Sequence, residues 1–339
     1  MVRYVDLIKD VEETTADPAV LHPPAAKIAW ESRRKPAQRI AESQAASDKE
    51  TYLSLRQHLL MIKASLLDKR NFDVEPLKEL VRNIVGEWDM VDRLYHYTIR
   101  FGHEEDFTAS HSINTMIYAL KMGRGLDYPR EDLEALGLAA LLHDVGMFTV
   151  PESIVKKPGS LTGEETDRIR EHTDIGRECL SAWMREMPFL SRVAHEHHER
   201  EDGSGYPRGM KGDEISEYAK IVGLADTYDA MTHDRPHRRA ISVRELIDTK
   251  NRSFPSRVMK AFLEQISFYP VGSVIKLNNR MVGRVVATNT GQPLRPVVKI
   301  LIDADGNPVT DEKTVNLLGN PIVWVAGPVP EKEMPRLEP

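Results

Sequence analysis

Seven histidine and aspartate side chains, spread over segments with helical periodicity, restrict most strongly how this chain can fold. Two adjacent pairs occur among them, and the full set is His111, His143, Asp144, His172, His197, His198 and Asp226. A lone histidine on an apolar helix face is usually a hydrogen-bonded core residue. Burying all seven separately would require many polar partners, whereas one shared metal centre satisfies them together. The set therefore predicts a helical fold that gathers these side chains around metal.

The candidate ligands lie on the inner faces or ends of expected helices in the middle of the chain. A leucine-rich segment ends in His143-Asp144, and Gly146 predicts a helix stop just beyond it. Thr162 and Glu165 form a capping box ahead of a single expected helix that carries His172 on its buried stripe. A further helix is expected to carry His197 and His198 on one face, and another to carry Asp226.

The flanking regions have a different character, so we expect three domains. Residues 1–100 begin with proline-interrupted sequence and then predict two amphipathic helices, capped near Ser47 and Asp73, with a regulatory role left open. Residues 101–265 hold every candidate ligand. Residues 266–339 read as a small β-rich module, with strands expected at 271–277, 283–287, 296–302 and 322–325. The expected fold class is mainly α.

Composition excludes several classes of protein. The formal net charge of −6 argues against a broad footprint on a DNA or RNA duplex. The single cysteine, Cys179, rules out an internal disulfide and fits a reducing cytoplasm, where we expect the protein to be located. The residues from Met1 to Asp10 lack an apolar signal core, and no apolar run is long enough to span a membrane.

The donor set predicts a pair of transition-metal ions. Asp144 can bridge two ions, because its carboxylate has two oxygens. The expected first site is His111, His143, Asp144 and Asp226, and the expected second site is Asp144, His172, His197 and His198. Imidazoles with few carboxylates favour iron, zinc or manganese over magnesium or calcium. A hydroxide that bridges the ions is the expected nucleophile, with His143 and Asp144 as the catalytic pair.

The order of the motifs from His111 to Ala240 resembles the HD-GYP domain, a branch of the HD phosphohydrolase superfamily. The His143-Asp144 pair alone is weak evidence, but the whole series in order is highly specific. The series comprises His111-Ser112-Ile113-Asn114, Leu141-Leu142-His143-Asp144-Val145-Gly146, Glu171-His172-Thr173-Asp174-Ile175-Gly176, His197-His198-Glu199-Arg200, Asp202-Gly203-Ser204-Gly205-Tyr206-Pro207, Ala225-Asp226-Thr227-Tyr228-Asp229-Ala230 and Arg235-Pro236.

The resemblance implies an HD-type helical bundle that hydrolyses cyclic di-GMP to pGpG and often onward to GMP. It implies a non-haem centre, commonly of iron, with manganese and zinc as alternatives. It places the loop of Gly205, Tyr206 and Pro207 beside the site, and Arg235 and Arg238 where they can grip the substrate. A low-turnover cyclic di-GMP receptor or scaffold, and a hydrolase of another cyclic dinucleotide, stay open. So do a homodimer and protein partners in signalling.

Two positions depart from the family pattern. The family commonly has a lysine three residues after the aspartate of the HD pair, and Met147 stands there in this chain. Members with three metals have a glutamate four residues before the first histidine, where this chain has Phe107. We therefore expect two metals, and Met147 leaves the efficiency of turnover open.

Overall fold

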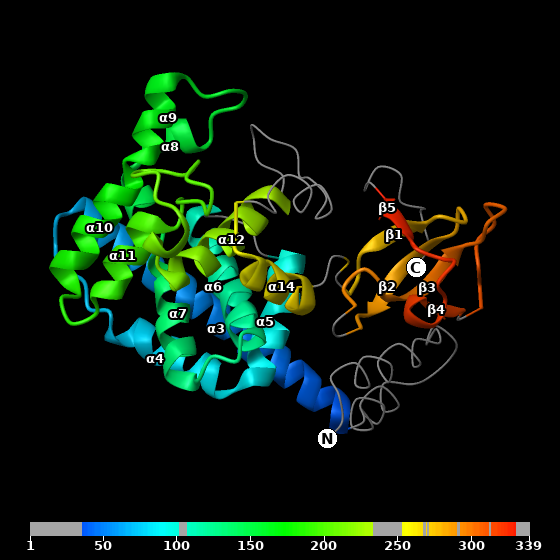
Figure 1. The fold of residues 1–339 in the computed structure, drawn as a ribbon. Helices are drawn as coiled ribbons and strands as arrows, with labels where there is room; N and C mark the ends of the chain where they lie inside the picture. Colours follow the sequence, from blue (N-terminus) through cyan, green and yellow to red (C-terminus); the bar gives the residue numbers. More distant parts are fainter. Residues whose placement is uncertain are drawn as a thin grey trace. The chain divides into compact units, whose positions relative to one another are not determined.

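The computed structural model describes residues 36–101, 107–232, 253–266, 269, 271–289, 292–311 and 313–329 (Figure 1). By its internal contacts the chain divides into Met1–Ser54 and Leu55–Pro339. The expected substrate contacts Arg235 and Arg238 lie outside the described residues. Within the described ranges, no helix combines the length and apolar character needed to cross a membrane.

The first described helices differ in part from expectation. They are α3 (Pro36–Leu67), α4 (Glu75–Gly86) and α5 (Trp88–Phe101). The expected start near Ser47 is wrong, because α3 already begins at Pro36, and proline is well tolerated in the first turn of a helix. The N-cap of α4 is Val74 and not the expected Asp73, although Asp73 Oδ1 accepts the Glu75 backbone N–H at 3.0 Å just ahead of the helix.

Helix α6 is the centre of the helical part of the chain. It is buried along almost its whole length and packs against α7, α12 and α14. A helix that is buried on all sides lies inside a bundle, which agrees with its position (Figure 1). The helices of this part are α6 (Phe107–Gly125), α7 (Arg130–Leu142), α8 (Glu152–Val155), α9 (Gly163–Arg170), α10 (His172–Trp183), α11 (Pro188–Glu196), α12 (Glu217–Thr232) and α14 (Ser256–Gln265), with 3-10 turns η1 (Val145–Thr149) and η2 (Gly212–Glu214).

The single helix expected from the capping box onward is two helices. The Thr162–Glu165 capping box is present at the start of α9, but the helix is interrupted at Glu171 before α10 begins at His172. At the break, the side chains of His172 and Thr173 bond to the carbonyl oxygens of Ile169 and Arg170. The two side chains thus add hydrogen bonds to the carbonyl oxygens at the end of α9, next to the break.

The ends of α11 also differ slightly from expectation. Helix α11 ends at Glu196, so His197 and His198 lie in the turn that follows it and not on its face. The position is equivalent to that of His143 and Asp144, which follow α7 as expected. Both adjacent pairs of candidate ligands therefore lie at the carboxyl end of a helix, where the chain can turn and present two successive side chains to one site.

The β module is a single antiparallel sheet with the strand order β4-β3-β2-β1-β5. Its core consists of apolar side chains from alternating strand positions, among them Ile275, Val285, Val298 and Ile300. The turns expected after β1 and at Asp305-Gly306 are present, whereas the short strand β4 was not expected. The strands are β1 (Val274–Leu277), β2 (Val282–Ala287), β3 (Val297–Ile302), β4 (Thr314–Asn316) and β5 (Val325–Pro328).

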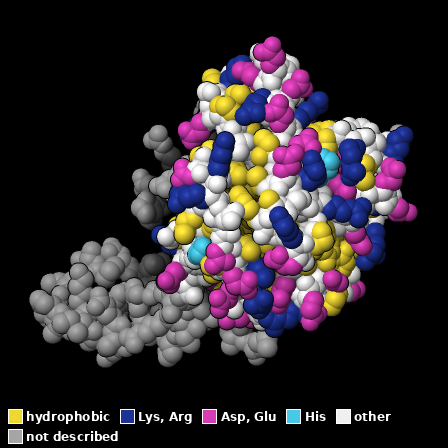
Figure 2. All heavy atoms as spheres, turned by 90° about the vertical axis from the view of Figure 1, so that its left-hand side faces the viewer, with side chains coloured by type: hydrophobic (Ala, Val, Ile, Leu, Met, Phe, Trp, Pro, Cys, Tyr) yellow, Lys and Arg dark blue, Asp and Glu magenta, His cyan; other side chains and the backbone are white. Residues whose placement is uncertain are grey.

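The surface carries both signs of charge in close mixture. On the face drawn in Figure 2, Lys and Arg side chains alternate with Asp and Glu, and a strip of hydrophobic side chains lies between them. This distribution agrees with the formal net charge of −6. Among the described residues on this face, it does not form the continuous basic stripe that nucleic-acid duplexes require.

Candidate metal centre

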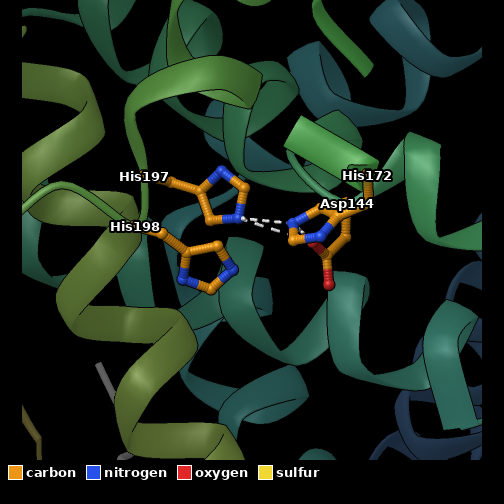
Figure 3. Close-up of side chains that lie close together, drawn as sticks. All are labelled: Asp144, His172, His197 and His198. Atoms are coloured by element: carbon orange, nitrogen blue, oxygen red, sulfur yellow. Dashed lines mark hydrogen bonds and ion pairs between the residues drawn. The ribbon is translucent and has the colours of Figure 1, made fainter. Parts of the chain in front are cut away.

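Two compact groups of metal-capable side chains share Asp144. The first contains Asp144, His172, His197 and His198, and these side chains converge from the ends of three helices (Figure 3). The second contains His111, His143 and Asp144. Within each group the candidate ligand atoms all lie within 4.8 Å of one another. The arrangement brings together the seven residues picked out by the sequence, with Asp226 described below.

The two oxygens of Asp144 face different histidines. Its Oδ1 lies 3.2 Å from His172 Nε2 and 3.4 Å from His197 Nε2. Its Oδ2 lies 3.6 Å from His143 Nε2 and 3.8 Å from His111 Nε2. One carboxylate thus separates the two sets of imidazoles, which is the geometry that a bridging ligand needs.

Three of the histidines are held so that Nε2 points into the centre. In each, Nδ1 is hydrogen-bonded to the backbone carbonyl three residues earlier in the chain, so that the Nε2 lone pair is left for a cation. The distances are 2.7 Å from His143 to Ala140 O, 2.5 Å from His172 to Ile169 O, and 3.0 Å from His197 to Ala194 O. Local helical geometry therefore fixes the ring orientations.

Two buried polar atoms of the centre make no well-formed hydrogen bond. They are His143 Nε2 and Asp144 Oδ1, and the latter has only the His172 and His197 Nε2 atoms as close neighbours among the described residues. Unsatisfied buried groups are costly, and a coordinated cation satisfies a lone pair and a carboxylate oxygen together. These residues therefore fit a divalent transition-metal ion.

Asp226 connects the two groups from α12. Its Oδ1 lies 2.9 Å from His111 Nε2, and its Oδ2 lies 3.6 Å from His198 Nδ1. Asp226 belongs to neither compact group, although it was expected at the first metal. Its place between His111 and His198 keeps it within reach of both sides of the centre.

The electrostatics of the centre differ between its imidazoles: the pKa values of His143 and His198 are lowered, whereas for His172 burial is outweighed, chiefly by the hydrogen bond to Asp144, and the pKa is raised. Burial lowers the pKa of His143 to about 4 and, together with His197, lowers the pKa of His198 well below its usual value. Burial acts to raise the pKa of Asp144, but the surrounding imidazoles, His143 first, lower it well below the usual range. Neutral imidazole and ionised carboxylate are the protonation states that bind metal.

Two residues missed by the sequence analysis support His111. Asp229, which is fully buried, accepts the His111 Nδ1–H at 2.7 Å through Oδ2 and the Asn114 Nδ2–H at 3.0 Å through Oδ1. Burial would lower the pKa of His111, but the hydrogen bonds to Asp226 and Asp229 outweigh it and raise the pKa to about 10. The available signal was the spacing, because residues three apart share a helix face.

The loop after His198 closes on the centre. The Tyr206 ring stacks on the His198 ring with the centroids 4.6 Å apart. Glu199, which is 3% exposed, accepts the backbone N–H groups of Arg208 at 2.7 Å and Met210 at 2.9 Å. The buried carboxylate of Glu199 thus holds the part of the loop at Arg208 and Met210 in place. The aromatic ring of the loop, Tyr206, covers the candidate ligand His198.

Gly205 is required by a close backbone approach in this loop. A Cβ at this position would lie 2.4 Å from His198 O and 2.5 Å from Arg200 N. We expect Gly205→Ala to displace Tyr206 from His198 and to destabilise the protein by about 1–3 kcal/mol, the usual cost of overpacking. Gly163→Ala is the matched control, because a Cβ there meets nothing within 4 Å. Thermal melts and kcat/KM of both variants test this, and equal behaviour of the two variants would contradict it.

Three other positions highlighted by the sequence lie outside the clusters. His195, expected to have no ligand role, is paired with Asp174 at 3.2 Å. Met147 is half-buried in η1 and offers no charge. The Phe107 ring stacks on His111 with the centroids 5.8 Å apart, so an apolar ring covers this side of the centre.

Comparison with known families assigns the helical part of the chain. Residues 96–253 match the family model of the HD domain, and residues 274–337 match a KOW domain associated with HD domains. Residues 96–253 are therefore similar to the HD-domain family. The resemblance to the HD-GYP branch and the mainly helical fold class are thereby confirmed.

Curated relatives of the chain are named phosphodiesterases. It is 32% identical over 222 residues to cyclic di-GMP phosphodiesterase PA4108 of Pseudomonas aeruginosa, covering 65% of this chain and 54% of that protein. It is 39% identical over 139 residues to 3'3'-cGAMP-specific phosphodiesterase 3 of Vibrio cholerae, covering 40% of this chain and 30% of that protein. The chain thus spans about half or less of the length of these relatives.

The solved structure of Bd1817, an HD-GYP-type protein from Bdellovibrio bacteriovorus, shares the fold. The TM-score is 0.53 at 15% sequence identity, and the similarity covers 65% of this chain and 71% of that chain. At this identity the likeness supports the helical architecture and carries no argument about the substrate.

Proposed function

We propose that this protein is a metal-dependent phosphodiesterase that hydrolyses cyclic di-GMP to pGpG, and onward to GMP. The observation that carries the proposal is the position of Asp144 between two pairs of histidine Nε2 atoms. The names of the curated relatives support a cyclic dinucleotide as the substrate class.

We assign two divalent ions to the centre, with iron preferred and manganese or zinc as alternatives. His111, His143 and Asp226 would hold one ion, His172, His197 and His198 the other, and Asp144 both. When bound, such a pair of ions supplies an activated water at neutral pH and neutralises charge on the phosphate. The protein's own contribution is to fix the imidazoles through the carbonyl bonds and through Asp229, so that little reorganisation is needed.

The Gly205-Tyr206-Pro207 loop would form one wall for the substrate. Burial raises the pKa of Tyr206, so its hydroxyl stays protonated and can donate a hydrogen bond to phosphate at neutral pH. Arg235 and Arg238 remain proposed substrate contacts from the family resemblance.

Product analysis tests the proposal directly. Protein purified without oxygen would be assayed for bound metals and incubated with cyclic di-GMP, 3'3'-cGAMP and cyclic di-AMP, and the products separated by chromatography. We expect cyclic di-GMP to give pGpG and then GMP at the highest kcat/KM. Protein with a full metal content that binds cyclic di-GMP without cleaving it would instead be the low-turnover receptor.

A second substrate has specific support. Three curated relatives, all from Vibrio cholerae, are named 3'3'-cGAMP-specific phosphodiesterases, and their identity to this chain reaches 39% over the matched region. Both dinucleotides contain the same phosphodiester linkage, so the metal centre cannot separate them, and discrimination has to come from contacts with the bases. The ratio of kcat/KM for the two substrates decides between them.

We expect Met147→Lys to increase the hydrolysis of cyclic di-GMP. Met147 is half-buried, so a lysine can keep its ammonium group hydrated while its stem packs in place. A well-placed charge-assisted hydrogen bond is worth roughly 1.5–3 kcal/mol, which sets an upper range of about 10–100-fold. Steady-state kinetics with measured metal content checks this. An unchanged or lower kcat/KM in a stable, fully loaded variant would rule out a missing cation as a limit.

A further inference from the structure

We propose that Arg170 is a substrate-contact residue that binds a phosphodiester of the cyclic dinucleotide at the rim of the metal centre. This inference rests on the proposed function of the centre. Arg170 is the last residue of α9 and is exposed, two positions before the candidate ligand His172. Its guanidinium carbon lies 5.1 Å from the centroid of the Tyr206 ring.

The position of Arg170 is fixed from two sides. Its backbone carbonyl accepts the Thr173 Oγ1–H at 3.0 Å, which ties the end of α9 to the first turn of α10. Its side chain lies over Tyr206, and Tyr206 in turn stacks on His198. Arg170 therefore lies next to the wall of the site through contacts with two separate segments of the chain.

The positive charge of Arg170 is also not paired with a carboxylate of the described residues. Among the described residues, its guanidinium has no hydrogen bond or ion pair, and its contact is the aromatic ring. On the same helix, Arg168 is paired with Glu171. Arg200, which precedes the loop of Gly205 and Tyr206 in the chain, donates hydrogen bonds to His197 O at 2.9 Å, Glu199 O at 2.8 Å and Thr227 Oγ1 at 3.2 Å. These neighbours are structural, whereas Arg170 is left for a ligand.

The aromatic contact prepares Arg170 for an anion. When a guanidinium group packs over an aromatic ring, the flat face of the guanidinium makes the contact. The N–H donors in the guanidinium plane therefore stay available, and their orientation is restricted. A phosphodiester offers two oxygens that such a planar fork can bind together. Since Met147 supplies no charge, Arg170 provides a cation next to the wall formed by Tyr206.

Binding and kinetics of three variants test this inference. The variants are Arg170→Ala, Arg170→Lys and the matched control Arg168→Ala, each checked for metal content and fold. The probe for binding is a phosphorothioate analogue of cyclic di-GMP that resists hydrolysis. We expect Arg170→Ala to raise its Kd and the KM of cyclic di-GMP by about 10–100-fold, with kcat nearly unchanged, because the contact exists in ground and transition states alike.

Two readouts separate a phosphate contact from a purely structural role. For Arg170→Ala, Kd should depend less on KCl concentration than for the wild type, since one ionic contact is lost. Arg170→Lys should recover part of the affinity because it keeps the charge, and Arg168→Ala should behave as the wild type. An Arg170→Ala variant with the same Kd and salt dependence as Arg168→Ala would overturn the inference. So would an Arg170→Ala variant in which only the preference between cyclic di-GMP and 3'3'-cGAMP changes.

Failure of the proposed function would be recognised separately. Wild-type protein that binds the analogue but cleaves no cyclic dinucleotide would disprove the phosphodiesterase, while the Kd values would still decide the role of Arg170. Wild-type protein that neither binds nor cleaves would overturn both.

Discussion

Asp144→Asn should remove most of the bound metal and nearly all hydrolysis. The amide keeps the size of the side chain but has one oxygen and no charge, so it cannot serve both histidine pairs that now face Oδ1 and Oδ2. Loss of an outer hydrogen-bond partner of a ligand already costs about 10–100-fold in metal affinity or activity, and loss of a bridging ligand should cost more. Elemental analysis and kcat on the same samples provide the measurement.

Stability gives an independent measure of the same change. A ligand that binds only the folded state raises its stability, so chelator should lower the Tm of the wild type and leave that of Asp144→Asn almost unchanged. Asp174→Asn is the matched control, because Asp174 is half exposed and pairs with His195 outside the clusters. Full metal content and turnover in Asp144→Asn would show that the carboxylate is not the bridge.

His172→Ala and His195→Ala should differ by at least two orders of magnitude in kcat. His172 is 1% exposed, and its Nε2 lies 3.2 Å from Asp144 Oδ1, so its loss removes a metal ligand and should lower kcat by more than about 100-fold. His195 contacts Asp174 away from the centre, so its loss removes no metal ligand and should leave kcat nearly unchanged. Metal content, kcat and circular dichroism compare the two. Equal losses in two folded proteins would place His195 in the centre and contradict the assigned ligand set.

The ligand types and their pairing into one centre could be predicted from the sequence. Adjacent pairs such as His143-Asp144 and inward positions such as His172 are visible in a one-dimensional pattern, because helical periodicity decides which side chains are buried. The capping box at Thr162 and the turn at Asp305-Gly306 were predictable for a similar reason: each depends on residues close together in the chain.

Features that depend on competition between local bonds were not predictable from the pattern. The helix that carries His172 is separated from α9 at Glu171, and α3 begins well before the expected cap. In both cases the residue types allow more than one arrangement, and the surrounding packing selects among them.

Tertiary structure alone decided which atoms meet across the centre. The sequence determined that seven buried polar side chains needed a common partner, since a buried imidazole or carboxylate cannot remain unsatisfied. It did not show that the two oxygens of Asp144 face different histidines, that Asp229 holds His111, or that Arg170 reaches Tyr206. These contacts join residues from separate helices, turns and loops, and their distances follow from how these segments pack and not from the order of residues in any one of them.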